Sequence, residues 1–255
     1  MGALPLDAVW SSGTGLVWAL IGARSAGVCL TAPVLAAPGF AWRFRIVLAM
    51  VLAAWLAPIV SPMIATPTAG RATVWLIANE LLIGGLIGWS ASLVVAGARQ
   101  AGDVVSAQAG LSVASLFDPE TGDESTALGH LYGLIALAVF LSMDGPLVMV
   151  EALIQSFQAM PAGRLVFDRS AAGLIFGQIA EALSLAVRAA APPAAALVVA
   201  GFAMGWLGRL APSVPLVALS LPVRAFLGVL LVLASLAALM LRLSEAWSGW
   251  VFGGG

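Results

Sequence analysis

The chain has 255 residues, of which 62% are hydrophobic and only 9% are charged. Soluble domains carry roughly a quarter charged residues, so this chain must bury apolar surface in lipid or in partner subunits. The formal net charge of −1 gives no basic surface for nucleic acid, and a single cysteine (Cys29) and a single histidine (His130) exclude disulfide frameworks, Cys/His metal sites and histidine-based triads. No metal and no cofactor is therefore expected.

Apolar blocks follow one another along the chain, each near the roughly 20 residues that cross a bilayer as a helix. The six blocks cover approximately residues 9–35, 46–60, 73–98, 127–143, 173–207 and 214–241. Alanine, leucine, valine and glycine fill them, and the alternation of a membrane strand is missing from the sequence. No basic residue precedes Arg24, so a cleaved signal peptide is not expected. The sequence predicts an all-α membrane-associated protein, organised as a single helical domain over residues 1–255.

The loop arginines do not define an orientation in the membrane. With the N-terminus outside, four arginines would face inward and four outward, namely Arg43, Arg45, Arg99 and Arg209 against Arg71, Arg164, Arg169 and Arg242. Prolines interrupt the last two blocks, at Pro192-Pro193 and at Pro212, Pro215 and Pro222. Freed backbone groups are tolerated where protein or water satisfies them, so these kinked helices are expected to pack against protein.

Ionisable residues interrupt the apolar blocks, where each is costly unless it is paired or hydrated. They are Arg24, Glu80, Asp144, Glu151, Glu181, Arg188 and Arg224. In the fifth block Gln178, Glu181, Ser184 and Arg188 fall on one side of a helix. Three interpretations stay open for this polar face: bonds between subunits, the wall of a water-filled lumen, or a proton relay through Glu181.

The stretch from Arg99 to Glu124 has a character of its own. It begins amphipathic, with Arg99 and Asp103 one helical turn apart and Gln108 further on, continues with the apolar LSVASLF, and ends in an acidic turn after Asp118-Pro119. Small residues recur every fourth position from Ala98 to Gly110, which favours close helix packing. Long loops with distinct character are usually functional, and the alternative is a hairpin that only packs.

Three motifs make the sequence similar to a known family. They are ARQAGDVVSAQAGLSVASLFDPETG from Ala98, LIALAVFLSMDGPL from Leu134, and SFQAMPAG at Ser156–Gly163. Together they resemble the flagellar biosynthesis protein FliR family, which includes the equivalent T subunit of virulence type III secretion systems. The resemblance is specific over residues 98–163 and extends to the ends only in hydropathy and block order.

This resemblance implies a core subunit of the type III protein export gate in the bacterial inner membrane, within a flagellar or secretion-system basal body. Such a subunit joins P- and Q-type export-gate subunits and B/A-type components, and unfolded exported proteins pass through the gate. Residues of about 1–165 would resemble the P subunit and about 166–255 the Q subunit. The loop in the pore would contain Gly110, Leu111, Val113, Leu116, Phe117, Asp118 and Pro119. The polar residues assigned to assembly are Arg24, Glu80, Arg99, Asp103, Gln108, Asp144, Glu151, Glu181, Arg188 and Arg224.

Other functions fit the residues less well. Phe117-Asp118-Pro119 matches the flagellar branch, whereas Asp144-Gly145-Pro146 replaces a Gly-His pair of many flagellar members, so the virulence system stays an alternative. A small-molecule transporter would need repeated broken helices, and no repeat is found. An intramembrane enzyme would need convergent ligands or a Gly-x-Ser-x-Gly motif, and the sequence offers neither. The protein is therefore not expected to be an enzyme.

Overall fold

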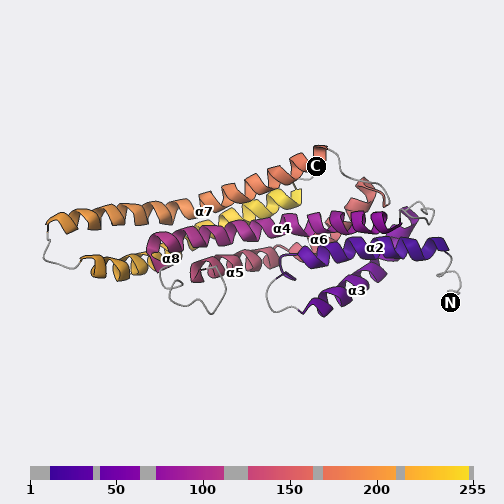
Figure 1. Cartoon of the computed structure of the whole chain (residues 1–255), viewed down its shortest axis with the longest axis horizontal. Helices are drawn as coiled ribbons and strands as arrows, with labels where there is room; N and C mark the ends of the chain where they lie inside the picture. The colour runs from indigo at the N-terminus through magenta and orange to yellow at the C-terminus, as the bar shows by residue number, and fades with distance from the viewer. Residues whose placement is uncertain are drawn as a thin grey trace. The chain divides into compact units, whose positions relative to one another are not determined.

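The computed structural model describes residues 12–36, 41–63, 73–111, 126–162, 169–210 and 216–252, and these are helical or in short connections (Figure 1). Its elements are α2 (Ser12–Thr31), α3 (Trp42–Val60), the 3-10 turn η1 (Ser61–Met63), α4 (Thr73–Ala109), α5 (Ala127–Ser142), α6 (Gly145–Ala159), α7 (Arg169–Leu210) and α8 (Leu216–Phe252). Four helical stretches are long and apolar enough to cross a membrane, and the broken pair α5–α6 would make a fifth. The prediction of an all-α membrane protein is confirmed.

Helices α4 and α6 extend beyond the apolar blocks of the sequence. Helix α4 continues past residue 98 to Ala109, because the polar residues beyond the apolar block are compatible with a helix and the breaker comes only at Gly110. Gly110 has φ 76°, a left-handed conformation typical of a glycine that ends a helix. Helix α6 is not among the predicted blocks, since it is only 15 residues long and exposes Glu151 and Gln155.

Prolines and a left-handed residue mark the other breaks. Helix α7 runs as one helix through Pro192 and Pro193, and α8 contains Pro222. Between α5 and α6, Asp144 has φ 55° and Pro146 follows within the first turn of α6. A proline suits the first turn because its missing N–H would be unbonded there in any case. The predicted stop at Asp144-Gly145-Pro146 thus coincides with the end of α5 at Ser142.

The chain forms two compact units. Unit 1 contains residues 1–92 and 144–177, and unit 2 contains residues 93–143 and 178–255, so α4 contributes its first half to unit 1 and its second half to unit 2. This division follows packing within the chain. The division near residue 165 into P-like and Q-like portions is a separate prediction that rests on the family resemblance.

In unit 1, α2 packs along α3 and against the first half of α4. Glycines permit the close approach of α2 and α4: a Cβ atom on Gly84 would meet the backbone carbonyl of Arg24, and one on Gly88 would meet Val28 and Thr31. The hydroxyl of Thr31 donates to the carbonyl of Gly85 at 2.9 Å. Small residues that bring helix backbones together are typical of packing in membranes, where apolar burial between helices gains little.

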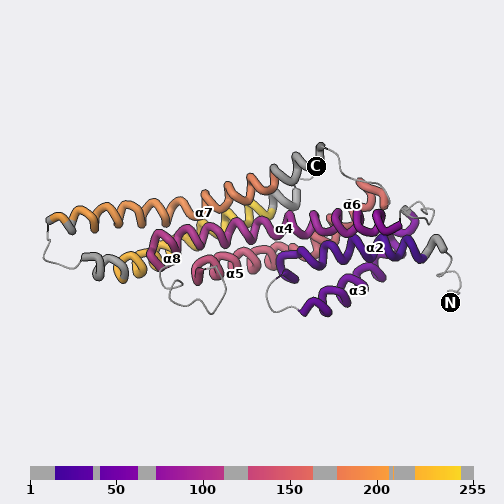
Figure 2. The backbone as a smooth tube through the Cα atoms, in the orientation of Figure 1, coloured from indigo at the N-terminus to yellow at the C-terminus, as the bar shows by residue number. Residues whose placement is uncertain are grey.

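In unit 2, the second half of α4 touches α7 and α8 through glycines. A Cβ atom on Gly97 would lie 2.6 Å from the carbonyl of Ala182 on α7, and one on Gly228 of α8 would lie 2.6 Å from the Cβ atom of Ala109. Helix α5 also runs beside α8 (Figure 2). There the rings of Phe140 and Trp247, both buried, lie with centroids 4.6 Å apart.

Much apolar surface stays uncovered on the long helices. In the apolar stretch of α7 only 33% of the residues are buried within the chain, and in that of α8 only 22%. Large side chains such as Trp55 of α3, Phe202 of α7 and Phe226 of α8 are exposed. Such surface is stable only against lipid or against other subunits.

Candidate functional site

The first candidate site is the base of the loop that joins α4 to α5. Of the seven residues predicted for the pore, the structure describes Gly110, which ends α4, and Leu111, which is half-buried. Val113, Leu116, Phe117, Asp118 and Pro119 lie outside the described residues. The structure therefore describes the residues on either side of the apolar segment, at the end of α4 and the start of α5.

A carboxylate of α4 holds the start of α5. Oδ1 of Asp103 accepts hydrogen bonds from the backbone N–H of Thr126 at 3.0 Å and from its hydroxyl at 2.7 Å. The Thr126 hydroxyl oxygen in turn accepts from the N–H of Gly129 at 3.1 Å and so caps α5. We call Asp103 and Thr126 the loop latch, because they tie the residue that precedes α5 to α4, about two turns before α4 ends.

Glycines bring α4 and α5 into backbone contact at the latch. A Cβ atom on Gly102 would lie 2.5 Å from the carbonyl oxygen of Leu128 and 2.7 Å from the Cα of Gly129. A Cβ atom on Gly129 would meet the Asp103 carboxylate, and one on Gly133 would lie 2.6 Å from Nε of Arg99. The absence of side chains here lets Asp103 reach Thr126. The loop therefore starts and ends on a tightly packed base.

Asp103 and Arg99 do not form an ion pair with each other, although they lie one turn apart on α4. The Asp103 carboxylate is bonded to Thr126, and Nε of Arg99 is buried without a hydrogen-bond partner among the described residues. Gln108, five residues beyond Asp103 on α4, is exposed. The amphipathic pattern of the sequence thus reflects one face of α4. The hydrogen bonds of the Asp103 carboxylate run to Thr126, at the start of α5.

The second candidate site is a buried ionic cluster in unit 1. Arg24 of α2 donates from Nε to Oε2 of Glu80 on α4 at 2.6 Å, and both side chains are 0% exposed. Its remaining nitrogens donate to the hydroxyl of Ser156 on α6 and to the carbonyl of Met160, each at 3.1 Å. The guanidinium carbon lies 4.0 Å from the centroid of the Phe157 ring. One guanidinium therefore ties together α2, α4 and the C-terminal end of α6.

The remaining polar residues assigned to assembly are at the surface of the chain. Asp144, Glu151, Glu181 and Arg188 are exposed and Arg224 is half-buried. Glu151 accepts a hydrogen bond from Gln155 at 3.3 Å. Within the part of the chain that the structure describes, Glu181 and Arg188 are not bonded to each other. Any burial of these two charges would have to come from another molecule.

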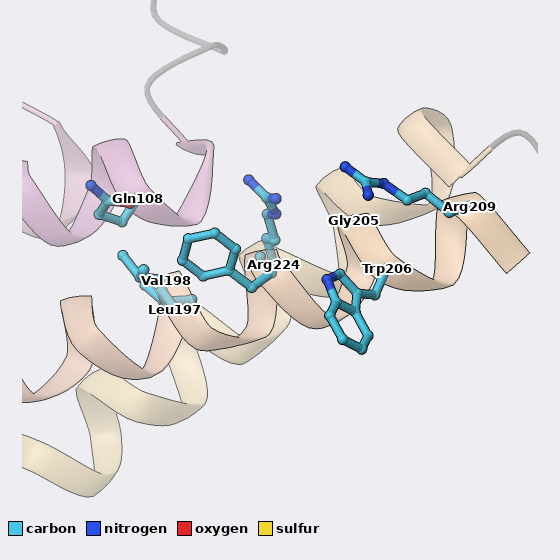
Figure 3. A pocket seen from close by; sticks show the side chains of 9 residues that line it. Gln108, Leu197, Val198, Gly205, Trp206, Arg209 and Arg224 are labelled. Carbon is cyan, nitrogen blue, oxygen red and sulfur yellow. The ribbon is translucent and has the colours of Figure 1, made fainter.

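The third candidate site is a pocket of about 520 Å³ in unit 2, formed by α4, α7 and α8 (Figure 3). Its polar wall consists of Gln108, Arg209 and Arg224, and Trp206 and Phe202 belong to its apolar wall. Sequence reasoning counts Arg209 only as a loop charge and does not single out Trp206. An arginine and a tryptophan together at the end of an apolar block are the signal that could have found this pocket.

The described residues bring together no group of three or more potential metal ligands. The ionic cluster around Arg24 is sealed from solvent, and the loop latch is a structural hydrogen-bond pair. What these sites can do is hold helices in register, position a loop and accept a ligand in the pocket.

Comparison with known proteins identifies the chain at the level of family. Residues 16–249 match the family of bacterial export proteins, family 1. The flagellar biosynthetic protein FliR of Pectobacterium carotovorum is 31% identical over 208 residues, covering 78% of this chain and 76% of that protein. The FliR of Escherichia coli K12 is 28% identical over 221 residues, covering 85% and 82%. The Yop proteins translocation protein T of Yersinia pestis is 27% identical over 173 residues, covering 67% and 66%.

These matches confirm the resemblance seen at residues 98–163 and extend it over most of the chain. The family is one of export-apparatus components and not of known enzymes. Membership implies that other components of the export apparatus are its partners. The chain belongs to family 1 of the bacterial export proteins and is a subunit of a type III export apparatus in flagellar or virulence secretion.

Proposed function

We propose that this chain is a core subunit of the gate that passes unfolded flagellar proteins, assembled with P- and Q-type subunits and with B/A-type components in the bacterial inner membrane. The FliR proteins of Pectobacterium carotovorum and Escherichia coli match at higher identity and over more of the chain than the Yersinia protein does, which favours the flagellar system. The corresponding role in a virulence system is the alternative.

The loop latch is the observation that carries this proposal. Asp103, about two turns before the end of α4, bonds to Thr126 at the start of α5, and the segment between the two helices contains the apolar run Leu111–Phe117. A fixed base with a displaceable apolar segment is what a closed gate needs. Narrow apolar constrictions exclude ions by dewetting, and weak apolar contacts can yield to a passing chain.

The surface of α7 supports assembly with partner subunits. Glu181 and Arg188 are exposed on a helix that is otherwise apolar enough to cross a membrane. Charges do not face lipid without a large cost, so this side of α7 should face another subunit or a water-filled lumen. Either surrounding is provided by a multi-subunit gate.

Co-expression tests the proposal directly. We expect the isolated chain to be heterogeneous in detergent and to become monodisperse when it is purified with the P- and Q-type subunits, as measured by size exclusion with light scattering. In that complex Glu181→Leu and Arg188→Leu should each reduce recovery of partners more than the double variant does, because a lone dry charge costs more than an apolar pair. Arg242→Leu, which removes an exposed arginine of α8, serves as the control.

A monodisperse monomer that binds neither subunit would contradict the proposed assembly. Equal recovery for the two single variants and the double variant would place Glu181 and Arg188 in water. To separate the two systems, the gene is expressed in a flagellar strain that lacks its own relative. Restored motility supports the flagellar role, and restored effector secretion in the corresponding virulence strain supports the alternative.

A further inference from the structure

The pocket of unit 2 concentrates positive charge at one end of α7 and α8. Arg209 and Arg224 both line it, and Figure 3 shows their side chains extending into the same space, with Arg224 between Gln108 and Arg209. None of its lining residues is acidic. The missing side chain of Gly201 leaves space for Arg224, since a Cβ atom on Gly201 would lie 3.0 Å from Nη2 of Arg224.

The described residues provide no counter-charge for the arginines of this pocket. Within the part of the chain that the structure describes, neither of them forms an ion pair, and Nε of Arg224 is buried without a hydrogen-bond acceptor. A buried donor with no acceptor is costly, and two guanidinium groups that share one space repel each other. A single anion between them would remove both costs, and the planar guanidinium fork suits the oxygens of a phosphate.

The apolar wall restricts the kind of phosphate. Leu197, Val198, Phe202 and Trp206 continue the pocket along α7, and Phe202 and Trp206 are 71% and 74% exposed. The volume of about 520 Å³ is that of a site for a sizeable ligand, far larger than one inorganic phosphate. An occupant that combines an anionic head with an apolar body fits both walls.

The position of the pocket along the helices points to the membrane interface. Helix α7 ends at Leu210 and helix α8 begins at Leu216, so Arg209 lies in the last turn of α7 and Arg224 within the first three turns of α8. Tryptophan and arginine at the ends of membrane helices lie at the level of lipid headgroups. We propose that this pocket binds the phosphodiester headgroup of an anionic phospholipid, with the acyl chains along Phe202 and Trp206.

This lipid would contact the helix that leads into the loop. Gln108 lines the pocket and lies within one turn of Gly110, where α4 ends. An amide donor at this place adds a third hydrogen-bonding group for the headgroup. The lipid would thereby bridge α4, α7 and α8 within unit 2.

Lipid titration of the full chain, purified with its partner subunits in neutral detergent, tests the proposal. Native mass spectrometry measures binding of phosphatidylglycerol, of phosphatidylcholine and of inorganic phosphate. Phosphatidylglycerol should bind at least about tenfold more tightly than phosphatidylcholine, whose choline cation is repelled by the arginines. Arg209→Gln combined with Arg224→Gln should weaken phosphatidylglycerol binding by about tenfold or more. Arg242→Gln, outside the pocket, should leave it unchanged.

A second pair of variants keeps both arginines. Gly205 lines the pocket, and a Cβ atom on it would have no other atom within 4 Å, so Gly205→Leu should fill the pocket without a clash and should weaken lipid binding. Gly177→Leu is the matched control, since Gly177 is on the same helix, is equally open and lies outside the pocket.

Three results would overturn the proposal. One is unchanged phosphatidylglycerol binding in both the arginine and the Gly205 variants. Another is displacement of phosphatidylglycerol by equimolar inorganic phosphate, which would indicate a free-anion site. The third is loss of a partner subunit from the variants with lipid binding intact, which would indicate that a carboxylate of that subunit is the anion.

Discussion

The buried pair of Arg24 and Glu80 offers a sharp test of the packing in unit 1. Both side chains are fully buried, and the shortest bond of the cluster joins them at 2.6 Å. We consider Arg24→Met and Glu80→Leu, which keep approximate side-chain volume but remove charge, singly and together. Each single variant removes one side of this ion pair, and the double variant removes both.

The expected magnitudes follow from what each variant leaves behind. Removing one partner of a buried ion pair costs about 3–5 kcal/mol, whereas replacing both by apolar residues is often close to neutral. The double variant also loses the bond from Arg24 to the Met160 carbonyl, worth about 1 kcal/mol. Ser156 keeps a bond, because its hydroxyl donates to the Leu153 carbonyl at 2.6 Å. The single variants should therefore be clearly less stable than the double variant.

The native cysteine provides the assay. Cys29 is the only cysteine, lies on α2 within two turns of Arg24, and is 3% exposed. A maleimide can react with it only when unit 1 opens, so the labelling rate reports the free energy of opening. A loss of 3–5 kcal/mol corresponds to labelling that is about 100- to 4,000-fold faster. The double variant should label within about tenfold of the native protein.

The exposed pair Arg242–Glu245 is the control, with side chains 53% and 66% exposed. Its removal should change the labelling rate little, because exposed pairs contribute about 0–1 kcal/mol. Equal labelling of the single and double variants would refute the reasoning, since it would mean that the charges are not energetically coupled. Native-like labelling of both single variants would show that the cluster is hydrated.

Three further predictions concern unit 2 and the loop. Asp103→Leu removes the acceptor of the loop latch and should cost about 1–3 kcal/mol, seen as faster hydrogen exchange in the first turn of α5; unchanged exchange would contradict the latch. Gly102→Ala should force α4 and α5 apart and lower the unfolding temperature. Gly85→Ala, on the same helix but with open space around it, should not lower it. Equal unfolding temperatures for the two variants would count against the close contact of α4 and α5. Shortening Leu111–Phe117 should let ions leak before export is lost, and Phe117→Ala should leak most among single changes; intact assembly with a tight membrane would mean that this segment is not the seal.

The helix boundaries that can be predicted are those where a backbone breaker stands in the sequence. The end of α5 is predictable because Asp144-Gly145-Pro146 interrupts the apolar run, and Asp144 indeed takes a left-handed φ of 55°. The apolar block ends at residue 98, whereas α4 continues through the amphipathic residues up to Ala109. Polar residues determine which face of a helix contacts water, but they do not end the helix. The residue that ends α4 is Gly110.

The partners of the site residues could not be predicted, because they come together only in the tertiary structure. Arg24 and Glu80 are recognisable as costly charges in apolar blocks, but they lie 56 positions apart and no periodicity links them. The Met160 carbonyl is a backbone group with no sequence signal. The latch is hidden for the opposite reason: Asp103 has a nearer cation in Arg99, yet it bonds to Thr126 across the loop.

Site-specific photo-crosslinking of a stalled export substrate tests the central claim most directly. A photoreactive residue is placed at Phe117, in the proposed seal, or at Trp55, an exposed position of α3 that serves as the control. If the chain forms part of the gate, the substrate should crosslink at Phe117 and not at Trp55. A complex that contains the P- and Q-type subunits, holds the stalled substrate and yet gives no crosslink at Phe117 would contradict the account.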